Sequence, residues 1–201
     1  MLPRLWNSTA APLLEEWFSC FSFLSSGAKW KVKEDYLVNP TNTLGLDEIF
    51  IKSNLAEDIQ EWETAAGTDI FGNEISGVVD SGSIGNIANG KNEVVFGNID
   101  GSGVIAVTYV WGVFSGPPQN RRLVEWDQIY DQVDFTWNND GNSNDMDFEN
   151  IAQHELGHSF GLGHPSDGCT EETMYRFASE GETKKRNLNS GDIAGIKKLY
   201  K

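Results

Sequence analysis

The sequence predicts an α+β fold, and three observations along the chain support that prediction. Residues 44–67 carry apolar side chains at the spacing of one helix face. Residues 68–137 are rich in glycine, asparagine and aspartate and contain several short runs of β-forming residues. Residues 148–162 again have a helical pattern, so helices flank a separate block of strands.

The first predicted elements are a strand and a long helix. Residues 29–40 predict a strand that ends at Asn39 and Pro40, a pair typical of turns. Residues 44–67 predict the helix, and Gly67 is its expected end because glycine suits a helix C-terminus. The residues expected on its buried face are Leu55, Ile59, Trp62 and Ala66.

The block that follows the first helix predicts short strands. Residues 115–120 contain two prolines and a glycine, and they separate the third candidate from the fourth. The four candidate strands are residues 77–80, 93–99, 103–114 and 131–137.

Two more helices complete the prediction. Asp147 is the expected N-cap of the helix over 148–162, because a carboxylate can accept from free amides of the first turn. Residues 190–200 predict a short last helix with Ser190 as N-cap and Asp192 in its first turn. The residues expected to point inward from this helix are Ile193, Ile196, Leu199 and Tyr200.

The composition is that of a folded protein rather than a disordered one. Of 201 residues, 39% are hydrophobic, and the formal net charge is −15. This charge disfavours binding to nucleic acid or to an anionic membrane, since both need basic side chains. No apolar run reaches the roughly 18 to 20 residues of a membrane-spanning helix.

The chain is expected to form one domain with a short extension. Residues 1–28 lack a clear period and predict an N-terminal extension or the remnant of a pro-segment, while the domain spans 29–201. The first residues make a poor signal peptide, because Arg4 is the single early cation and Glu15 and Glu16 interrupt the apolar stretch.

All three histidines of the chain lie between residues 154 and 164. On a helix, His154 and His158 lie one turn apart on the same face and can reach one ion. Gly161 permits a sharp turn that brings His164 back as a third ligand. Three nitrogen ligands leave a tetrahedral zinc with one open position for water. Glu155 lies beside that position and is the candidate general base.

Two other interpretations of the histidine cluster remain open from sequence. The pentapeptide at 154–158 can occur by chance on a structural helix, although Gly161, His164 and Met174 at their further spacings argue against chance. Alternatively, Cys169 could close the site as a fourth ligand and make it structural. Cys20 and Cys169 could also form one disulfide or remain free thiols.

Several segments resemble the metzincin metalloproteases, and among them the matrixins and their prokaryotic relatives. The residues that carry this resemblance are "HELGHSFGLGH" at 154–164, "TMY" at 173–175, the ending at 188–200 and the opening strand and helix from residue 36. The resemblance covers about residues 29–201. It implies a twisted mixed five-stranded sheet with two long helices, a short C-terminal helix, and a cleft between two unequal parts.

The resemblance also implies functional roles for individual residues. Glu155 would be the general base, Met174 the hydrophobic floor below the zinc, and Tyr175 part of the pocket for the residue after the cut bond. Residues 176–188 would form the loop that sets the depth of that pocket. The zinc ligands would be His154, His158 and His164.

Two further implications concern the substrate and a second metal. Residues 103–110 would form an edge strand to which an extended peptide adds, or alternatively a plain core strand. Calcium could bind the polar loop 138–147, or the loop could be a polar turn that ends in an N-cap. Its candidate oxygen ligands are Asp140, Asn142, Asn144, Asp145 and Asp147.

The chain also departs from the family pattern. No histidine remains for the structural zinc that matrixins usually carry, so we expect one catalytic zinc. Cys20 lacks the sequence context of the family's latency motif, and Pro165 stiffens the exit from the third ligand.

The sequence therefore predicts a zinc endopeptidase that cleaves protein or peptide substrates as a monomer. Family resemblance implies secretion. The alternatives are a non-catalytic zinc- or peptide-binding module and a structural metal domain closed by Cys169.

Overall fold

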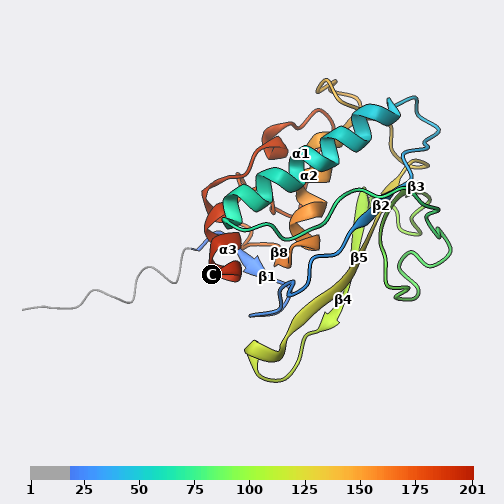
Figure 1. The fold of residues 1–201 in the computed structure, drawn as a ribbon. Coiled ribbons are helices and arrows are strands. Elements are labelled where there is room, and N and C mark those ends of the chain that lie inside the picture. The colour runs from blue at the N-terminus through green and yellow to red at the C-terminus, as the bar shows by residue number, and fades with distance from the viewer. Residues whose placement is uncertain (1–18) are drawn as a thin grey trace, which may run out of the picture.

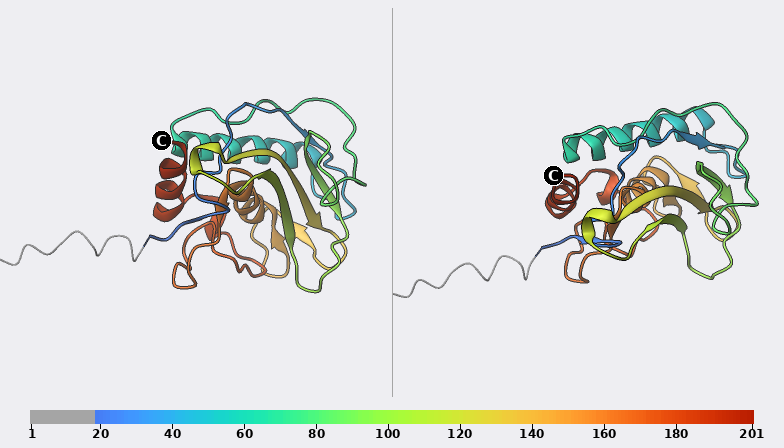
Figure 2. Two further views of the ribbon diagram at one scale, coloured as in Figure 1. Left: turned by 90° about the horizontal axis from the view of Figure 1, so that it is seen from below. Right: turned by 60° about the horizontal axis from the view of Figure 1, so that its bottom comes forward.

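The computed structural model describes residues 19–201, so the N-terminal prediction for residues 1–18 lies outside the described part. A mixed sheet forms the centre, and two long helices, α1 and α2, lie on one side of it (Figures 1 and 2). The helices are α1 (Glu48–Ala66), α2 (Phe148–Ser159) and α3 (Ser190–Tyr200). The strands of the main sheet are β2 (Tyr36–Val38), β3 (Asn92–Gly97), β4 (Ala106–Val113) and β5 (Arg122–Asp131). The short elements are β1 (Ser22–Phe23), β6 (Trp137–Asn138), β7 (Met146–Asp147), β8 (Leu162–Gly163) and the 3₁₀ turns η2 (Pro118–Asn120) and η3 (Lys184–Arg186).

The main sheet has the strand order β2-β3-β5-β4. Strands β2, β3 and β5 run parallel, and β4 pairs antiparallel with β5, so the sheet is mixed as expected. Within residues 19–201 it has four strands rather than five. β4 lies at the edge of this sheet, which agrees with an edge strand rather than a central one.

Two of the expected strands are wrong, for local reasons. Residues 77–80 form a loop in which Val78 is 84% exposed. The Asp80 amide donates to the Glu93 carboxylate instead of a neighbouring strand. Residues 131–137 do not form a strand throughout, because the Asp131 carboxylate accepts from the next amides and turns the chain.

Hydrogen bonds at the helix ends confirm the predicted Asp147 cap of α2 and the predicted Gly67 end of α1, whereas α1 begins at Glu48 rather than at residue 44. Asp47 caps α1 and Asp147 caps α2, each by accepting from the amide three residues later. Gly67 ends α1 at a φ of 74°, a value that glycine adopts without steric cost. The N-cap of α3 is Asn189 rather than Ser190, and the Asp192 carboxylate accepts from the Asn189 amide.

The core lies between the sheet and the two long helices. Trp62 of α1 is fully buried and donates its indole N–H to the Gln153 carbonyl of α2. Leu55 and Ile59 are buried on the same face of α1, as predicted. On α3, Ile196 and Leu199 are buried. This packing holds α2, which carries His154 and His158, against α1. No helix within the described part of the chain is long and apolar enough to cross a membrane.

Residues 20–24 pack against the C-terminal part of the chain. Strand β1 pairs antiparallel with β8, so that Ser22 faces Gly163 and Phe23 faces Leu162. The Leu24 amide continues the pairing by donating to the Gly161 carbonyl at 3.0 Å. The end of the predicted extension therefore lies beside the segment that links the second and third histidines.

Three acidic side chains are buried on the outer face of the sheet. Glu93 is paired with Asp127 across β3 and β5, and Glu125 lies two residues before Asp127. All three are at most 2% exposed. Neither carboxylate oxygen of Asp127 has a hydrogen-bond partner among the described residues. Burial, together with Glu125 and Glu93, raises the pKa of Asp127 to about 7.

We expect Asp127→Asn to stabilise the protein increasingly as pH rises. In the unfolded chain an aspartate ionises near pH 3.9, whereas folded Asp127 keeps its proton until about pH 7. The wild type therefore loses stability between these two values, and the variant does not. The expected gain near pH 7.5 is on the order of 1–2 kcal/mol. Urea unfolding in EDTA at pH 5 and 7.5 measures it, and a difference that does not grow with pH contradicts it.

Candidate metal centre

The three histidines converge on one point. His154 and His158 project from α2, and His164 follows β8. The His164 Nε2 atom lies 3.2 Å from Nε2 of His154 and 3.1 Å from Nε2 of His158. Among residues 19–201, this is the one group of three His, Cys, Asp or Glu side chains with ligand atoms all within 4.8 Å.

Gly161 brings the third histidine back, as the sequence predicts. Its φ is 106°, and its amide donates to the His158 carbonyl at 2.9 Å to close the helix end. A Cβ atom here would lie 3.1 Å from the Ala28 carbonyl oxygen and 3.1 Å from Leu199. Glycine is therefore required both by the backbone conformation and by the close approach of two other segments.

Backbone carbonyls fix the protonation of two of the histidines. Nδ1 of His154 lies 2.6 Å from the Thr173 carbonyl oxygen, and Nδ1 of His158 lies 2.9 Å from that of Leu162. A carbonyl only accepts, so each Nδ1 carries the hydrogen and each Nε2 keeps its lone pair. Orienting partners of this kind are typical of histidine ligands to zinc.

Burial keeps the histidines neutral. It is the main cause that lowers the pKa of His154, His158 and His164, the last to about 4. Neutral imidazoles are the form that binds metal. Three converging nitrogen lone pairs repel one another unless a cation lies between them. The donor set therefore fits a zinc ion with three protein ligands.

Glu155 lies next to the triad and is almost fully buried. The Thr108 hydroxyl of β4 donates to its carboxylate at 2.5 Å and to its backbone carbonyl at 3.1 Å. Burial raises the pKa of Glu155 to about 7, while the Thr108 hydrogen bond and the charge of Lys185 oppose that rise. Thr108 holds the carboxylate in place, a role that the sequence did not indicate.

Met174 lies against the helix that carries the first two ligands. It is 1% exposed, and a Cβ atom on Gly157 would lie 2.1 Å from its sulfur. The absence of a side chain on Gly157 lets Met174 pack directly against α2. The role of Met174 as the floor below a zinc stays a prediction.

Asp192 ties the Met174 turn to the last helix. Its carboxylate accepts from the Thr173 amide at 2.7 Å and from the Met174 amide at 3.1 Å. Thr173 in turn accepts from His154, so α3 supports the metal ligand through two hydrogen bonds in series. The sequence indicated Asp192 as a helix-start residue and gave no sign of this contact.

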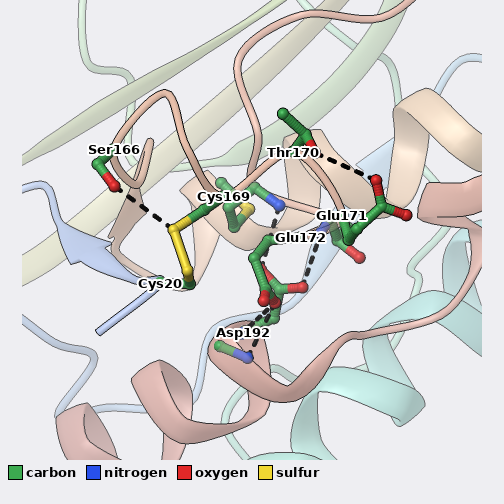
Figure 3. Close-up of a disulfide and its surroundings, with 10 residues drawn as sticks. Cys20, Ser166, Cys169, Thr170, Glu171, Glu172 and Asp192 are labelled. Atoms are coloured by element: carbon green, nitrogen blue, oxygen red, sulfur yellow. Dashed lines mark hydrogen bonds between the residues drawn. A yellow bond between two sulfur atoms is a disulfide. The ribbon is translucent and has the colours of Figure 1, made fainter. Parts of the chain in front are cut away.

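Cys169 is not available as a fourth ligand. Its sulfur is bonded to that of Cys20, across 149 residues of chain (Figure 3). The interpretation of a structural site closed by Cys169 is therefore wrong. The disulfide also settles the pairing that the sequence left open. It ties the segment before β1 to the loop that follows His164.

Two cavities flank the triad along β4. One has a volume of about 330 Å³ and is lined by all three histidines, Glu155 and residues 106–108 of β4. The other, of about 160 Å³, extends from His154 and Glu155 past the start of β4 and Ile151. Arg176 lines both cavities.

Tyr175 does not line either cavity, which differs from the sequence prediction. Its ring packs edge-on against Phe177 at 5.7 Å, and its carbonyl accepts from the Lys185 ammonium at 2.6 Å. The next residue, Arg176, contributes its side chain to both cavities instead. Residues Arg176, Ala178 and Lys185 of the 176–188 loop line the smaller cavity.

The polar loop at 138–147 has protein donors for its oxygens. Asp147 caps α2 and is paired with Arg186, while Asp145 accepts from Asn142 at 2.9 Å. Asp140 and Asn142 accept from amides two residues later within the loop. The loop is a polar turn that ends in an N-cap, and we propose no calcium site there.

Comparison with known proteins identifies similar sequences. Residues 93–201 match the matrixin peptidase family. The chain is 44% identical to matrilysin of Homo sapiens over 61 residues, which cover 30% of this chain and 22% of matrilysin. It is 36% identical to metalloendoproteinase 4-MMP of Arabidopsis thaliana over 98 residues, 49% of this chain and 25% of that protein. Metalloendoproteinase 1 of Glycine max is 48% identical over 55 residues, 27% of this chain and 17% of that protein. The matched part thus spans a quarter or less of these relatives.

Proposed function

The chain belongs to the matrixin family, and from this premise we propose that it is a zinc-dependent endopeptidase acting on protein or peptide substrates. The observation that carries the proposal is the triad of neutral histidines beside the buried carboxylate of Glu155. With Cys169 in a disulfide, the described residues supply three ligands, so one coordination position stays open for chemistry.

Zinc held by His154, His158 and His164 would lower the pKa of a water to roughly 7 and polarise the scissile carbonyl. Glu155 then takes the proton from the attacking water and later gives it to the leaving amine. Thr108 keeps the Glu155 carboxylate directed along the cleft through its hydroxyl hydrogen bond. Met174 and Asp192 hold the ligand helix and the Thr173 carbonyl in position.

Among residues 19–201, one edge of β4 has no partner strand, and this edge supports a mode of substrate binding. β4 pairs with β5 on one side, and its residues 106–108 line the cavity that contains the triad. An extended peptide can add to this edge as a further strand and place its scissile bond at the metal. The smaller cavity then receives the side chain after the cut bond, with the 176–188 loop as its wall.

The disulfide supports the proposal that the protein works outside the cytosol, because such bonds persist in oxidising compartments. We further propose that it acts as a monomer, with a domain over residues 29–201 and an extension before it. The packing of residues 20–24 on that domain makes the end of the extension part of the folded unit.

We expect the purified protein to contain about one zinc per chain and to cleave members of a broad peptide library. A chelator should abolish cleavage, and added zinc should restore it. Metal analysis and mass spectrometry of the library measure both. A protein that binds zinc but cuts nothing favours the alternative of a non-catalytic peptide-binding module.

A further inference from the structure

We propose that the smaller cavity selects peptides with an acidic side chain, glutamate or aspartate, directly after the cut bond. This inference rests on the proposed endopeptidase function and adds its substrate class. The feature that carries it is a pair of cationic side chains, Arg176 and Lys185, in the lining of this cavity.

The cavity is apolar along its length and cationic at two points. Its apolar lining comes from residues 103–106 at the start of β4, together with Ile151 and Ala178. Glu155 is its one acidic residue, and that carboxylate already accepts from Thr108 at the reacting end. The rest of the lining therefore offers positive charge without a matching negative one.

Lys185 is a buried cation with incomplete compensation. The residue is 1% exposed, and its ammonium donates to the carbonyls of Tyr175 at 2.6 Å and Phe177 at 2.8 Å. An ammonium has three donors, and the nearest carboxylate oxygen, on Glu182, lies 3.8 Å away. Burial lowers the pKa of Lys185 to about 8, so it remains mainly charged at neutral pH. A substrate carboxylate in the cavity would compensate this charge.

Arg176 lines both cavities and can exchange its ion pair with Asp167 for one with a substrate carboxylate. Its guanidinium is paired with Asp167 at 2.5 Å, but the two side chains are 44% and 69% exposed. Exposed ion pairs of this kind contribute little to stability. A substrate carboxylate that enters a less hydrated cavity makes a stronger charge-assisted hydrogen bond with Arg176. The arginine can thus leave Asp167 for the substrate.

The acidity of the whole protein strengthens the contrast. The chain has 30 acidic residues against 15 lysines and arginines. A cavity with two cations and one engaged acid is locally opposite in sign to that balance. An apolar side chain would fill the volume but would cover the Lys185 charge without neutralising it, which is unfavourable in a low-dielectric site.

The test uses three peptides that differ in the residue after the cut bond, which is Glu, Gln or Leu. Gln matches Glu in shape and lacks its charge. We expect the zinc-loaded wild type to have a kcat/KM for the Glu peptide about tenfold or more above that for the Gln peptide. Arg176→Gln should reduce this ratio about tenfold, because it removes the exchangeable cation.

Two further variants sharpen the test. Asp167→Asn should raise the Glu-to-Gln ratio, because it frees Arg176 from its present partner. Lys184→Gln removes a neighbouring cation that does not line the cavity, so it should leave the ratio unchanged. Equal or faster cleavage of the Gln and Leu peptides by wild type overturns the acidic preference and leaves the peptidase proposal standing. An unchanged ratio in Arg176→Gln also overturns it. If the zinc-loaded protein cuts none of the three peptides and no member of the library, both the endopeptidase function and the acidic preference are overturned.

Discussion

Replacement of Glu155 by Ala is expected to lower kcat/KM for peptide cleavage by about 10²- to 10⁴-fold, the usual contribution of a general base. Zinc content should stay near one ion per chain. In the proposed site the three imidazoles would hold the metal through Nε2. The Glu155 carboxylate accepts from Thr108 and would not be needed to bind the metal.

Two companion variants separate the roles. Glu155→Gln keeps the shape and can still accept from Thr108, so it should fold as the wild type does and be as inactive as Glu155→Ala. His158→Ala removes a ligand and should lose zinc together with activity. Metal analysis after gel filtration and a fluorogenic peptide assay measure both quantities. Cleavage that survives in Glu155→Ala would falsify the assignment of Glu155 as the base.

Removal of the disulfide is expected to have the largest effect on stability. For the 149-residue separation between Cys20 and Cys169, the chain-entropy relation gives a loss of about 5 kcal/mol in free energy of unfolding. The double variant Cys20→Ser with Cys169→Ser should therefore unfold at a much lower urea concentration. Local loosening should begin at β1, whose pairing with β8 involves two residues on each strand.

The matched control for the double variant is the wild type with its disulfide reduced. The double variant and the reduced wild type should have the same midpoint of urea unfolding. The oxidised wild type should have a higher midpoint than either. The Leu24 amide donates to Gly161 next to the ligands. Its hydrogen exchange should be faster in the double variant and in the reduced wild type than in the oxidised wild type. Equal stability of the double variant and the oxidised wild type contradicts the prediction.

Features that depend on near neighbours in the sequence could be predicted. The two long helices, the Asp147 cap and the Gly67 end follow from spacing and capping rules over a few residues. The histidine cluster belongs to the same class, since the helix period and Gly161 determine most of its geometry.

Features that depend on distant contacts could not be predicted. Strand β5 went unrecognised because Glu125, Asp127 and Gln128 look like surface residues, yet each is at most 2% exposed. The Thr108 contact with Glu155 spans 47 residues, and no local pattern marks it. The residues that line a cavity are harder still to predict from the sequence. The expected wall residue Tyr175 lines neither cavity, whereas its neighbour Arg176 lines both, and this difference depends on packing of the whole loop.

The support that α3 gives to the metal ligands has a consequence for biosynthesis. His154 depends on Thr173, and Thr173 depends on Asp192, 19 residues further along at each step. A chain growing on the ribosome therefore carries all three histidines before the residue that anchors their floor has been made. The centre can reach its final geometry only after α3 has left the exit tunnel. The support that α3 gives to the proposed peptidase site therefore forms only after residue 192 has emerged from the tunnel.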